Sequence, residues 1–141
     1  MADNRTVKDP VAEMATRALK KTNVIKVTGW DQAKQRFIFV APHDCRIDDV
    51  QVVSDTGVSA SDVNYYSFQV QDLSAGMALL SSPKTTRVTG GTAITADTPY
   101  SLAPNQNQVV SDGAVLELQM TETGAAVDLT GAEIIVVVEY T

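Results

Sequence analysis

From about residue 24 onwards, hydrophobic and polar residues alternate with a period of two, which predicts β-strands with one buried and one wet face. In "NYYSFQVQDL", Tyr66, Phe68 and Val70 alternate with more polar neighbours. The stretch "AVLELQMTET" repeats the pattern, and its inward-facing residues are predicted to be Leu116, Leu118 and Met120.

Further short strands are predicted between closely spaced turn signals. Gly90-Gly91 is the sharpest signal, because two residues with positive φ suit a tight hairpin. Many short strands at this spacing predict an all-β, antiparallel sandwich, or less simply a barrel. The remaining predicted strands cover residues 24–28, 36–40, 47–54, 77–81, 85–89, 92–95, 108–110 and 133–140.

The N-terminal segment has a different period. In "DPVAEMATRALKK", residues 9–21, Asp9 suits a helix N-cap and Pro10 the first helical turn. The sequence therefore predicts an N-terminal arm, residues 1–35, with one short helix, followed by a β-sandwich domain, residues 36–141. The helix lies either on its own domain or on another chain. Its apolar stripe is Val11, Met14, Ala15, Ala18 and Leu19.

The last predicted strand, in "AEIIVVVEY", is apolar on both faces. Ile134, Val136 and Val138 share one face, while Ile135 and Val137 share the other. A sandwich strand normally turns one face to water. Either this strand is central and covered by the N-terminal arm, or Ile135 and Val137 contact a neighbouring subunit; we favour the second interpretation.

Charge divides the chain into two parts. The formal net charge is −6, yet residues 1–36 contain eight basic and four acidic groups, whereas residues 37–141 contain three basic and thirteen acidic groups. A basic arm before an acidic body favours a partner with an acidic surface. Nucleic acid is a poor candidate, because no aromatic residues are interleaved with the basic ones and the body is acidic.

Neither a membrane protein nor a secreted one is expected. The longest aliphatic run, Ile134–Val138, is far shorter than the roughly 20 residues that cross a bilayer. "MADNRTVKDP" has no apolar core of the kind that a secretory signal needs, so we expect synthesis in a cytoplasm. The single cysteine excludes an intrachain disulfide and agrees with a reducing compartment.

The stretch "FIFVAPHDCRIDDVQVVSD" gathers His43 and Cys45 among several carboxylates, and so raises the question of chemistry. One histidine and one cysteine cannot complete a zinc site within one chain, although a site shared across a symmetry axis stays open. No oxyanion hole is recognisable for a Cys–His nucleophile. A bend at residues 41–44 between two strands is favoured, with Pro42 fixing one torsion and Asp44 accepting amides of the turn.

Other chemistries have weaker signals. Carboxylate pairs for glycoside hydrolysis and a weak calcium site among loop aspartates are possible in any acidic protein, and no Asp-x-Asp-x-Asp-Gly loop is present. No phosphate-binding glycine loop occurs. We therefore expect no enzyme activity and no cofactor. A carbohydrate-binding surface would need exposed rings, for which the candidates are Trp30, Tyr65, Tyr66 and Tyr100, although Trp30 better suits a plug between arm and body.

Four segments carry a resemblance to a known family: "FVAPHDCRIDDVQVV", "DVNYYSFQVQD", "AITADTPYSLAP" and "SDGAVLELQMTETGAAVDLTGAEIIVVVEY". Over residues 36–141 the sequence resembles the small jelly-roll decoration, or cement, proteins on the heads of tailed bacteriophages. In that family an "AP" bend opens the body, a "DG" turn precedes a "VLELQMT" strand, and a valine-rich strand closes the chain.

The resemblance implies a jelly-roll-like sandwich that forms a homotrimer, binds the major capsid protein on the outer surface of the virion near three-fold positions, and stabilises contacts between capsomers. It implies subunit contacts through Ile135 and Val137. The alternative is a carbohydrate-binding or adhesion module of a viral head fibre, and an enzyme of unknown type is a third possibility. The arm residues expected to contact the capsid are Lys8, Val11, Met14, Arg17, Leu19, Lys20 and Lys21.

Overall fold

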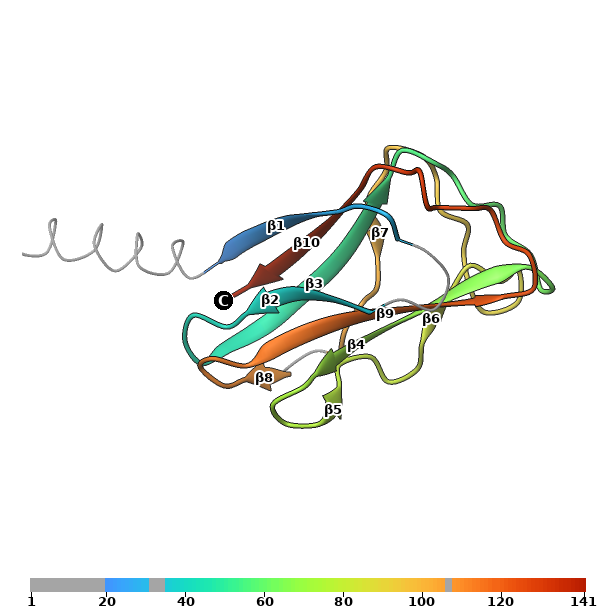
Figure 1. Ribbon diagram of the computed structural model, residues 1–141. Coiled ribbons are helices and arrows are strands. Elements are labelled where there is room, and N and C mark those ends of the chain that lie inside the picture. The colour runs from blue at the N-terminus through green and yellow to red at the C-terminus, as the bar shows by residue number, and fades with distance from the viewer. Residues whose placement is uncertain (1–19, 31–34, 106–107) are drawn as a thin grey trace, which may run out of the picture.

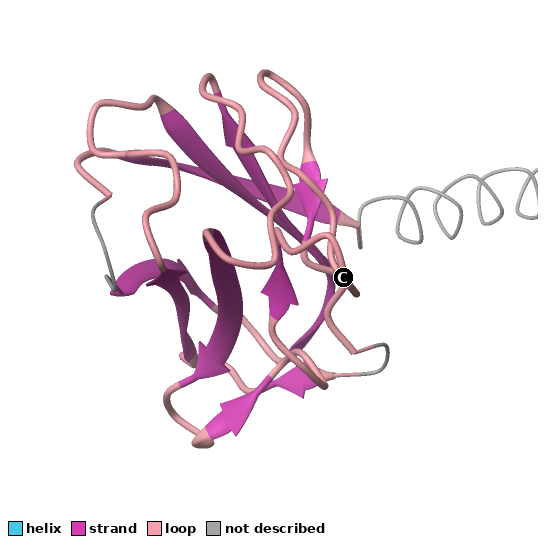
Figure 2. Cartoon of the chain, turned by 90° about the vertical axis from the view of Figure 1, so that its right-hand side faces the viewer, coloured by secondary structure: helices cyan, strands magenta, loops and turns pink. Residues whose placement is uncertain are grey.

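The computed structural model describes residues 20–30, 35–105 and 108–141. Within these ranges the chain forms strands, turns and loops, arranged as two antiparallel sheets that lie face to face (Figures 1 and 2). The all-β antiparallel sandwich predicted from the alternation is confirmed, while the jelly-roll connectivity stays a prediction. No helix in these ranges is long and apolar enough to cross a membrane.

The first sheet, called here the β10 sheet, follows the order β1-β10-β3-β7, and β8 pairs with the opposite end of β3. Strand β10 is therefore flanked by strands on both sides, as a strand with two apolar faces requires. Its register places Val24 beside Val137 and Val137 beside Gln51. The strands are β1 (Lys21–Val27), β3 (Cys45–Ser54), β7 (Tyr100–Ser101), β8 (Val109–Val110) and β10 (Ile134–Tyr140).

The second sheet, called here the β9 sheet, follows the order β2-β9-β4-β5, and β6 also pairs with β4. The β4–β9 ladder is continuous from Tyr65, opposite Thr123, to Asp72, opposite Leu116. It is the longest regular strand pair of this sheet, because every other pair in the sheet is shorter or irregular. The strands are β2 (Gln35–Val40), β4 (Tyr65–Asp72), β5 (Met77–Ala78), β6 (Lys84–Thr85) and β9 (Val115–Thr123).

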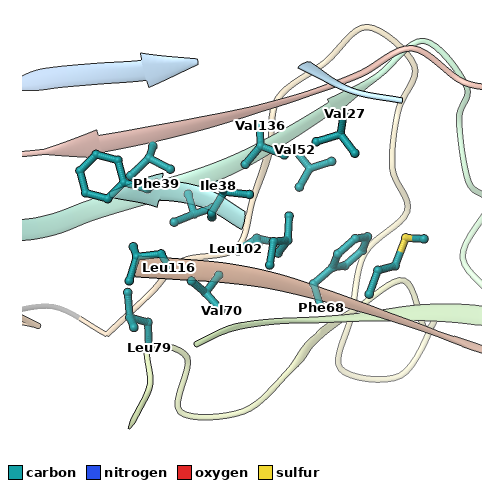
Figure 3. Packing of buried hydrophobic residues seen from close by; sticks show 14 of the residues in the cluster. Val27, Ile38, Phe39, Val52, Phe68, Val70, Leu79, Leu102, Leu116 and Val136 are labelled. Carbon is teal, nitrogen blue, oxygen red and sulfur yellow. The ribbon is translucent and has the colours of Figure 1, made fainter. Parts of the chain in front are cut away.

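The core fills the space between the two sheets, and its composition confirms the predicted inward faces. In β4 buried and half-buried residues alternate without a break. Figure 3 shows Phe68, Val70 and Leu116 of the β9 sheet facing Val52 and Val136 of the β10 sheet. Buried side chains predicted from the alternation are Tyr66, Phe68, Val70, Leu116, Leu118, Met120, Ile134, Val136 and Val138.

Trp30 lies inside this core. It is 1% exposed, and its ring meets that of Phe68 edge-on, with centroids 6.0 Å apart. This geometry is favourable for aromatic pairs and adds to the burial of both rings. Trp30 is thus a central core residue, reached from the end of β1.

The bend after Val40 is confirmed, but its geometry differs from the prediction. The strand that follows, β3, does not return beside β2; it crosses into the opposite sheet. Asp44 does not accept amides of its own turn either: its Oδ1 accepts the N–H of Asp112, 2.8 Å away. The bend at residues 41–44 and the turn at residues 112–113 are therefore joined by hydrogen bonds. Ala41 adds two backbone bonds, in which it donates to the Ala114 carbonyl and accepts from the Gly113 N–H.

The predicted hairpin at Gly90-Gly91 is wrong, as are the strands predicted over residues 85–89 and 92–95. Only Gly90 has a positive φ, of 75°. Gly91 is required for a different reason, because a Cβ there would lie 2.3 Å from the carbonyl oxygen of Thr85. Strand β6 ends at Thr85. Thr86 still donates its N–H to the carbonyl oxygen of Tyr66 at 3.0 Å, but the N–H of Tyr66 is accepted by the Thr86 hydroxyl, at 2.9 Å, in place of a backbone carbonyl.

The start of the sandwich lies earlier than the alternation indicated. Strand β1 begins at Lys21, opposite Tyr140 of β10, so a complete strand of the β10 sheet precedes residue 36. Lys21 therefore cannot end a helix, as the pattern of residues 9–21 predicted, because its backbone is extended. Lys20 is exposed and belongs to no element, and residues 9–19 of the predicted helix lie outside the described residues.

Replacement of Phe68 tests the core. Phe68 is 1% exposed and contacts the rings of Trp30, Tyr66 and Tyr100. We expect Phe68→Ala to lower the free energy of unfolding by about 3–5 kcal/mol, because it removes a large buried ring and leaves a cavity. Urea unfolding of both forms measures the difference.

The matched control is Phe37→Ala, which makes the same change at a side chain 65% exposed. Its effect should stay within about 0.5 kcal/mol, as for most exposed positions. Equal losses for the two variants would contradict this description of the core.

Candidate interaction surface

The outer face of the β10 sheet carries a row of apolar side chains at its centre. Ile135 and Val137 point away from the core, and Ile135 is 36% exposed. Register places Val24, 58% exposed, beside Val137, and Val53, half-buried, beside Ile135. The outward orientation predicted for Ile135 and Val137 is thus present, and two neighbouring strands extend their surface. These four residues are called here the valine face.

Polar groups that are already partnered border the valine face. On one side, Lys26 Nζ lies 3.0 Å from Glu133 Oε1. On the other, Asp49 accepts hydrogen bonds from the Ser101 hydroxyl at 2.7 Å and from the Gln51 amide at 3.0 Å. An apolar centre inside a polar rim is the usual composition of a protein–protein contact.

An open depression of about 290 Å³ adjoins this face. It is lined by Lys26, Val53, Asp55, Asp97, Glu133 and Ile135. Its lining thus combines two residues of the valine face, Val53 and Ile135, with three carboxylates and one lysine. Such a depression can receive a side chain of a partner, and its net negative charge favours a basic one.

A second exposed apolar pair, missed in the sequence, lies on edge strand β2. Phe37 and Val40 are 65% and 61% exposed. A register shift between Phe37 and Phe39 turns Ile38 and Phe39 both inward, so the residues on either side face outward. The run "RFIFV" does not alternate between apolar and polar residues, and this break in the pattern could have predicted a bulge.

The corner after β2 does not form an activated thiol. Cys45 is 3% exposed, and burial, followed by the charges of Asp44 and Asp48, raises the pKa of its thiol. His43 is exposed, and its Nδ1 lies 2.8 Å from the carbonyl oxygen of Asp44, to which it donates. A raised pKa lowers the thiolate fraction, which opposes the nucleophilic role considered for this pair.

Aromatic rings that could form a sugar-binding platform are mostly inside the protein. Trp30, Tyr66 and Tyr100 are between 1% and 6% exposed. Tyr65 is half-buried, and the guanidinium of Arg87 lies over its ring, 5.3 Å from the centroid. The four rings proposed for carbohydrate contact therefore do not share one exposed surface.

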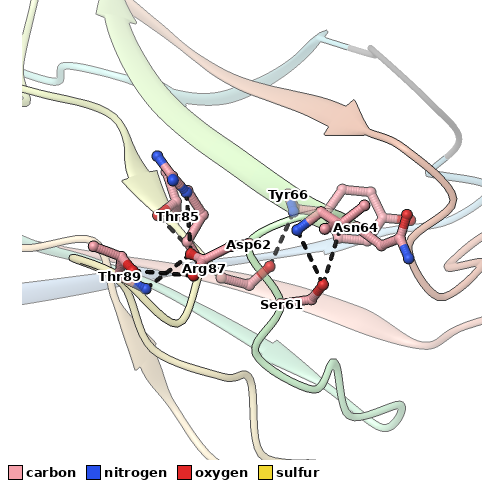
Figure 4. Close-up of polar contacts among 9 residues, drawn as sticks. Ser61, Asp62, Asn64, Tyr66, Thr85, Arg87 and Thr89 are labelled. Carbon is pink, nitrogen blue, oxygen red and sulfur yellow. Dashed lines mark hydrogen bonds and ion pairs between the residues drawn. The ribbon is translucent and has the colours of Figure 1, made fainter.

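A polar cluster holds the loops at the far end of the sandwich, as Figure 4 shows. Asp62 accepts hydrogen bonds from the backbone amide and the hydroxyl of Thr89, and its carboxylate lies 3.4 Å from Arg87 Nε. The Thr89 amide chiefly, with the Thr89 hydroxyl and Arg87, lowers the pKa of Asp62. These contacts tie residues 85–92 to the loop before β4.

Among the described residues, no group of three or more histidine, cysteine or acidic side chains is placed to hold a metal ion. The arm residues predicted to contact the capsid, Lys8, Val11, Met14, Arg17 and Leu19, lie outside the described part of the chain. Lys20 and Lys21 are exposed where the chain enters β1.

Comparison with known proteins shows similarity at the level of fold. Neither a protein-family model nor a curated protein matches the chain. A chain of the cyanophage Pam1 capsid asymmetric unit is similar in structure, with a TM-score of 0.50 and 12% identity, over 86% of this chain and 81% of that one. This chain therefore shares its fold with that chain of the Pam1 capsid unit.

Chains of infectious bursal disease virus also align in part. The Gx-strain chain gives a TM-score of 0.34 at 14% identity, and the Gt-strain chain 0.31 at 10% identity. The alignments cover 85% and 86% of this chain but 32% and 37% of the viral chains. This chain thus spans about a third of their length.

Thiol reactivity tests the description of the corner. We expect Cys45 in the native protein to react with a soluble disulfide reagent at least about 100-fold more slowly at pH 8 than in the unfolded chain, because burial blocks access and the raised pKa keeps the thiol protonated. Absorbance of the released thiolate measures both rates. Rapid native reaction would contradict a buried, inactive cysteine.

Proposed function

We propose that this protein is a structural component of a phage virion, which binds the outer surface of the capsid and stabilises contacts between capsomers. The valine face carries the proposal, because an apolar row inside a partnered polar rim suits association with another protein surface. The fold similarity to a Pam1 capsid chain supports it. The proposed role is mechanical and requires neither a catalytic group nor a cofactor.

The proposed assembly is a homotrimer at three-fold positions of the shell. In it, Ile135 and Val137 lie between subunits, and closing the ring covers apolar area that a monomer leaves in water. Each buried apolar side chain at such a contact contributes on the order of 1–2 kcal/mol. The carbohydrate-binding alternative has less support, since its candidate rings are largely buried.

The proposed shell contact uses the basic arm against the major capsid protein. Residues 37–141 hold thirteen acidic and three basic groups, whereas residues 1–21 hold the basic groups Arg5, Lys8, Arg17, Lys20 and Lys21 against three acidic ones, so the entry to the sandwich is the part suited to an acidic shell surface. In this arrangement Lys8, Arg17, Lys20 and Lys21 meet the acidic surface, while Val11, Met14 and Leu19 enter a groove between capsomers. The virion surface is the proposed location, and no nucleic acid or membrane takes part.

Replacement of Ile135 tests the subunit contact. We expect Ile135→Asp to weaken self-association by about 2 kcal/mol or more, roughly 30-fold in the dissociation constant, because it places a charge in an apolar contact. Light-scattering mass over a range of concentrations measures the change.

Val127→Asp provides the matched control at a loop side chain 43% exposed, where association should be unchanged. Circular dichroism checks that both variants remain folded. If the folded wild-type protein is monomeric at high concentration, or if Ile135→Asp associates like the wild type, the proposed trimer contact is refuted.

Removal of the arm tests the shell contact. The deletion should end at residue 19, because Lys21 already pairs with β10. We expect the shortened protein to keep its sandwich but to bind capsid shells, assembled from the major capsid protein of the same virus, at least about tenfold more weakly. Co-sedimentation with these shells measures binding.

Salt dependence separates the possible partners of the arm. Binding of the whole protein should weaken only modestly between low and high salt, because apolar contacts are not screened. A steep logarithmic loss would indicate a polyanion such as nucleic acid instead. Equal shell binding with and without residues 1–19 would exclude the arm as the capsid contact.

A further inference from the structure

Three of the four sheet edges in the described part of the chain are interrupted. On the far side, both sheets end in pairs of two-residue strands, β7 and β8 in one sheet and β5 and β6 in the other. On the near side, β2 has a register shift between Phe37 and Phe39. Short strands and bulges are the usual protection of an edge against pairing with another chain.

The fourth edge, β1, has neither a short strand nor a bulge, and its protection is limited to the charged side chains of Lys21 and Lys26. It runs for seven residues in unbroken register, from Lys21 opposite Tyr140 to Val27 opposite Ile134, and contains no proline. Its other side pairs with no strand among the described residues. A straight edge of this length presents a row of backbone donors and acceptors to a partner strand.

We propose that β1 pairs with β1 of a second copy, antiparallel, about a two-fold axis that passes beside Val24. Val24 is the middle residue of the strand, so this register uses the whole strand on both sides. Shifting the register in either direction leaves residues of both strands unpaired. The pairing joins the two β10 sheets into one continuous sheet.

Side chains on the outer face agree with this register. Val24 lies opposite its own symmetry mate, and the β1–β10 register adds Val137 on the outside of each. Four valines thereby form one row across two copies. Val24 is 58% exposed in the single copy, and cross-strand contact with a second β-branched side chain would cover it.

The charges also agree. Opposite Lys26 stands Thr22 of the second copy, so no lysine faces a lysine. Thr22 is paired in turn with Glu139, which places this carboxylate two strand spacings, about 10 Å, from the Lys26 backbone. A lysine side chain can extend across the small threonine towards it, and Lys26 would do so in exchange for its exposed ion pair with Glu133. The two-fold axis repeats this contact, giving two complementary charge pairs.

This contact goes beyond the proposed function, because it uses the free backbone edge of β1, whereas the proposed trimer contact uses the outward side chains of β10; Val24 and Val137 border both. A small edge contact predicts weak, concentration-dependent association. Other possible occupants of the edge are residues 1–19 of the same chain and a strand of another protein.

A cysteine at the axis tests the register in the full-length protein. Val24→Cys should form disulfide-linked pairs on mild oxidation, since the new thiol lies opposite its mate within bridging distance. The native thiol, Cys45, is buried and should not compete. The matched control is Val63→Cys, at a loop side chain 71% exposed, which should cross-link at least about tenfold more slowly.

A lysine at the axis tests the energetics. Val24→Lys should raise the dissociation constant of this contact about tenfold or more, because two like charges then face each other. Val63→Lys, with the same charge change, should have no effect. Sedimentation velocity over a range of concentrations measures association, and circular dichroism checks folding.

The outcomes decide between occupants. Cross-linked pairs of Val24→Cys together with weakened association of Val24→Lys support the contact. Equal cross-linking of the two cysteine variants overturns it. Unchanged association of Val24→Lys also overturns it. Slow amide exchange of β1 in a protein that stays monomeric overturns it as well, and would assign the edge to the chain's own N-terminal segment.

Discussion

The fold depends on burying the inner faces of four long strands against one another. Strands β3 and β10 supply one apolar layer and β4 and β9 the other, with the rings of Phe68 and Trp30 filling the space between them. Neither layer is stable alone, because an isolated pair of strands leaves its apolar face in contact with water. Once the four strands are joined, the remaining short strands and loops need only close the ends of the sandwich.

Side chains replace strand pairing along the far side of the molecule. The side-chain amide of Gln69 accepts the N–H of Leu80 and donates to the carbonyl oxygen of Leu80, as a backbone peptide group would. The Thr86 hydroxyl accepts the N–H of Tyr66. Asp72 accepts the amides of Ser74 and Ala75 in the turn before β5. Backbone groups are thus satisfied where regular strands end. The far edges are consequently irregular but not unpaired.

Local patterns in the sequence were sufficient for the long strands and insufficient for the edges. The period of two in residues 65–72 matches burial directly, and in residues 115–123 it identifies the inward Leu116, Leu118 and Met120, although Glu117 on the other face is also buried. Residues 85–89 resemble a strand by composition, but their partners are the Asp62 carboxylate, which accepts the N–H of Thr89, and the N–H of Tyr66, which donates to the Thr86 hydroxyl. Neither partner is visible in the local pattern. The valine face could be predicted in part: Ile135 and Val137 followed from a two-sided strand, while Val24 and Val53 required the register. Phe37 and Val40 are exposed through a bulge that only long-range pairing with β9 creates.

The first and last strands begin and finish at the same end of the sandwich (Figure 1). Lys21 enters β1 beside Tyr140, and Thr141 exchanges two backbone hydrogen bonds with Arg46 in β3. A pulling force on the chain before Lys21, directed along β1 and away from the body, would drag this strand lengthwise past β10. Every rung of their seven-residue ladder would then carry the load in parallel, the geometry of shear, in which bonds must break together and not one after another. Such an attachment point resists tension better than a strand that is peeled from its end.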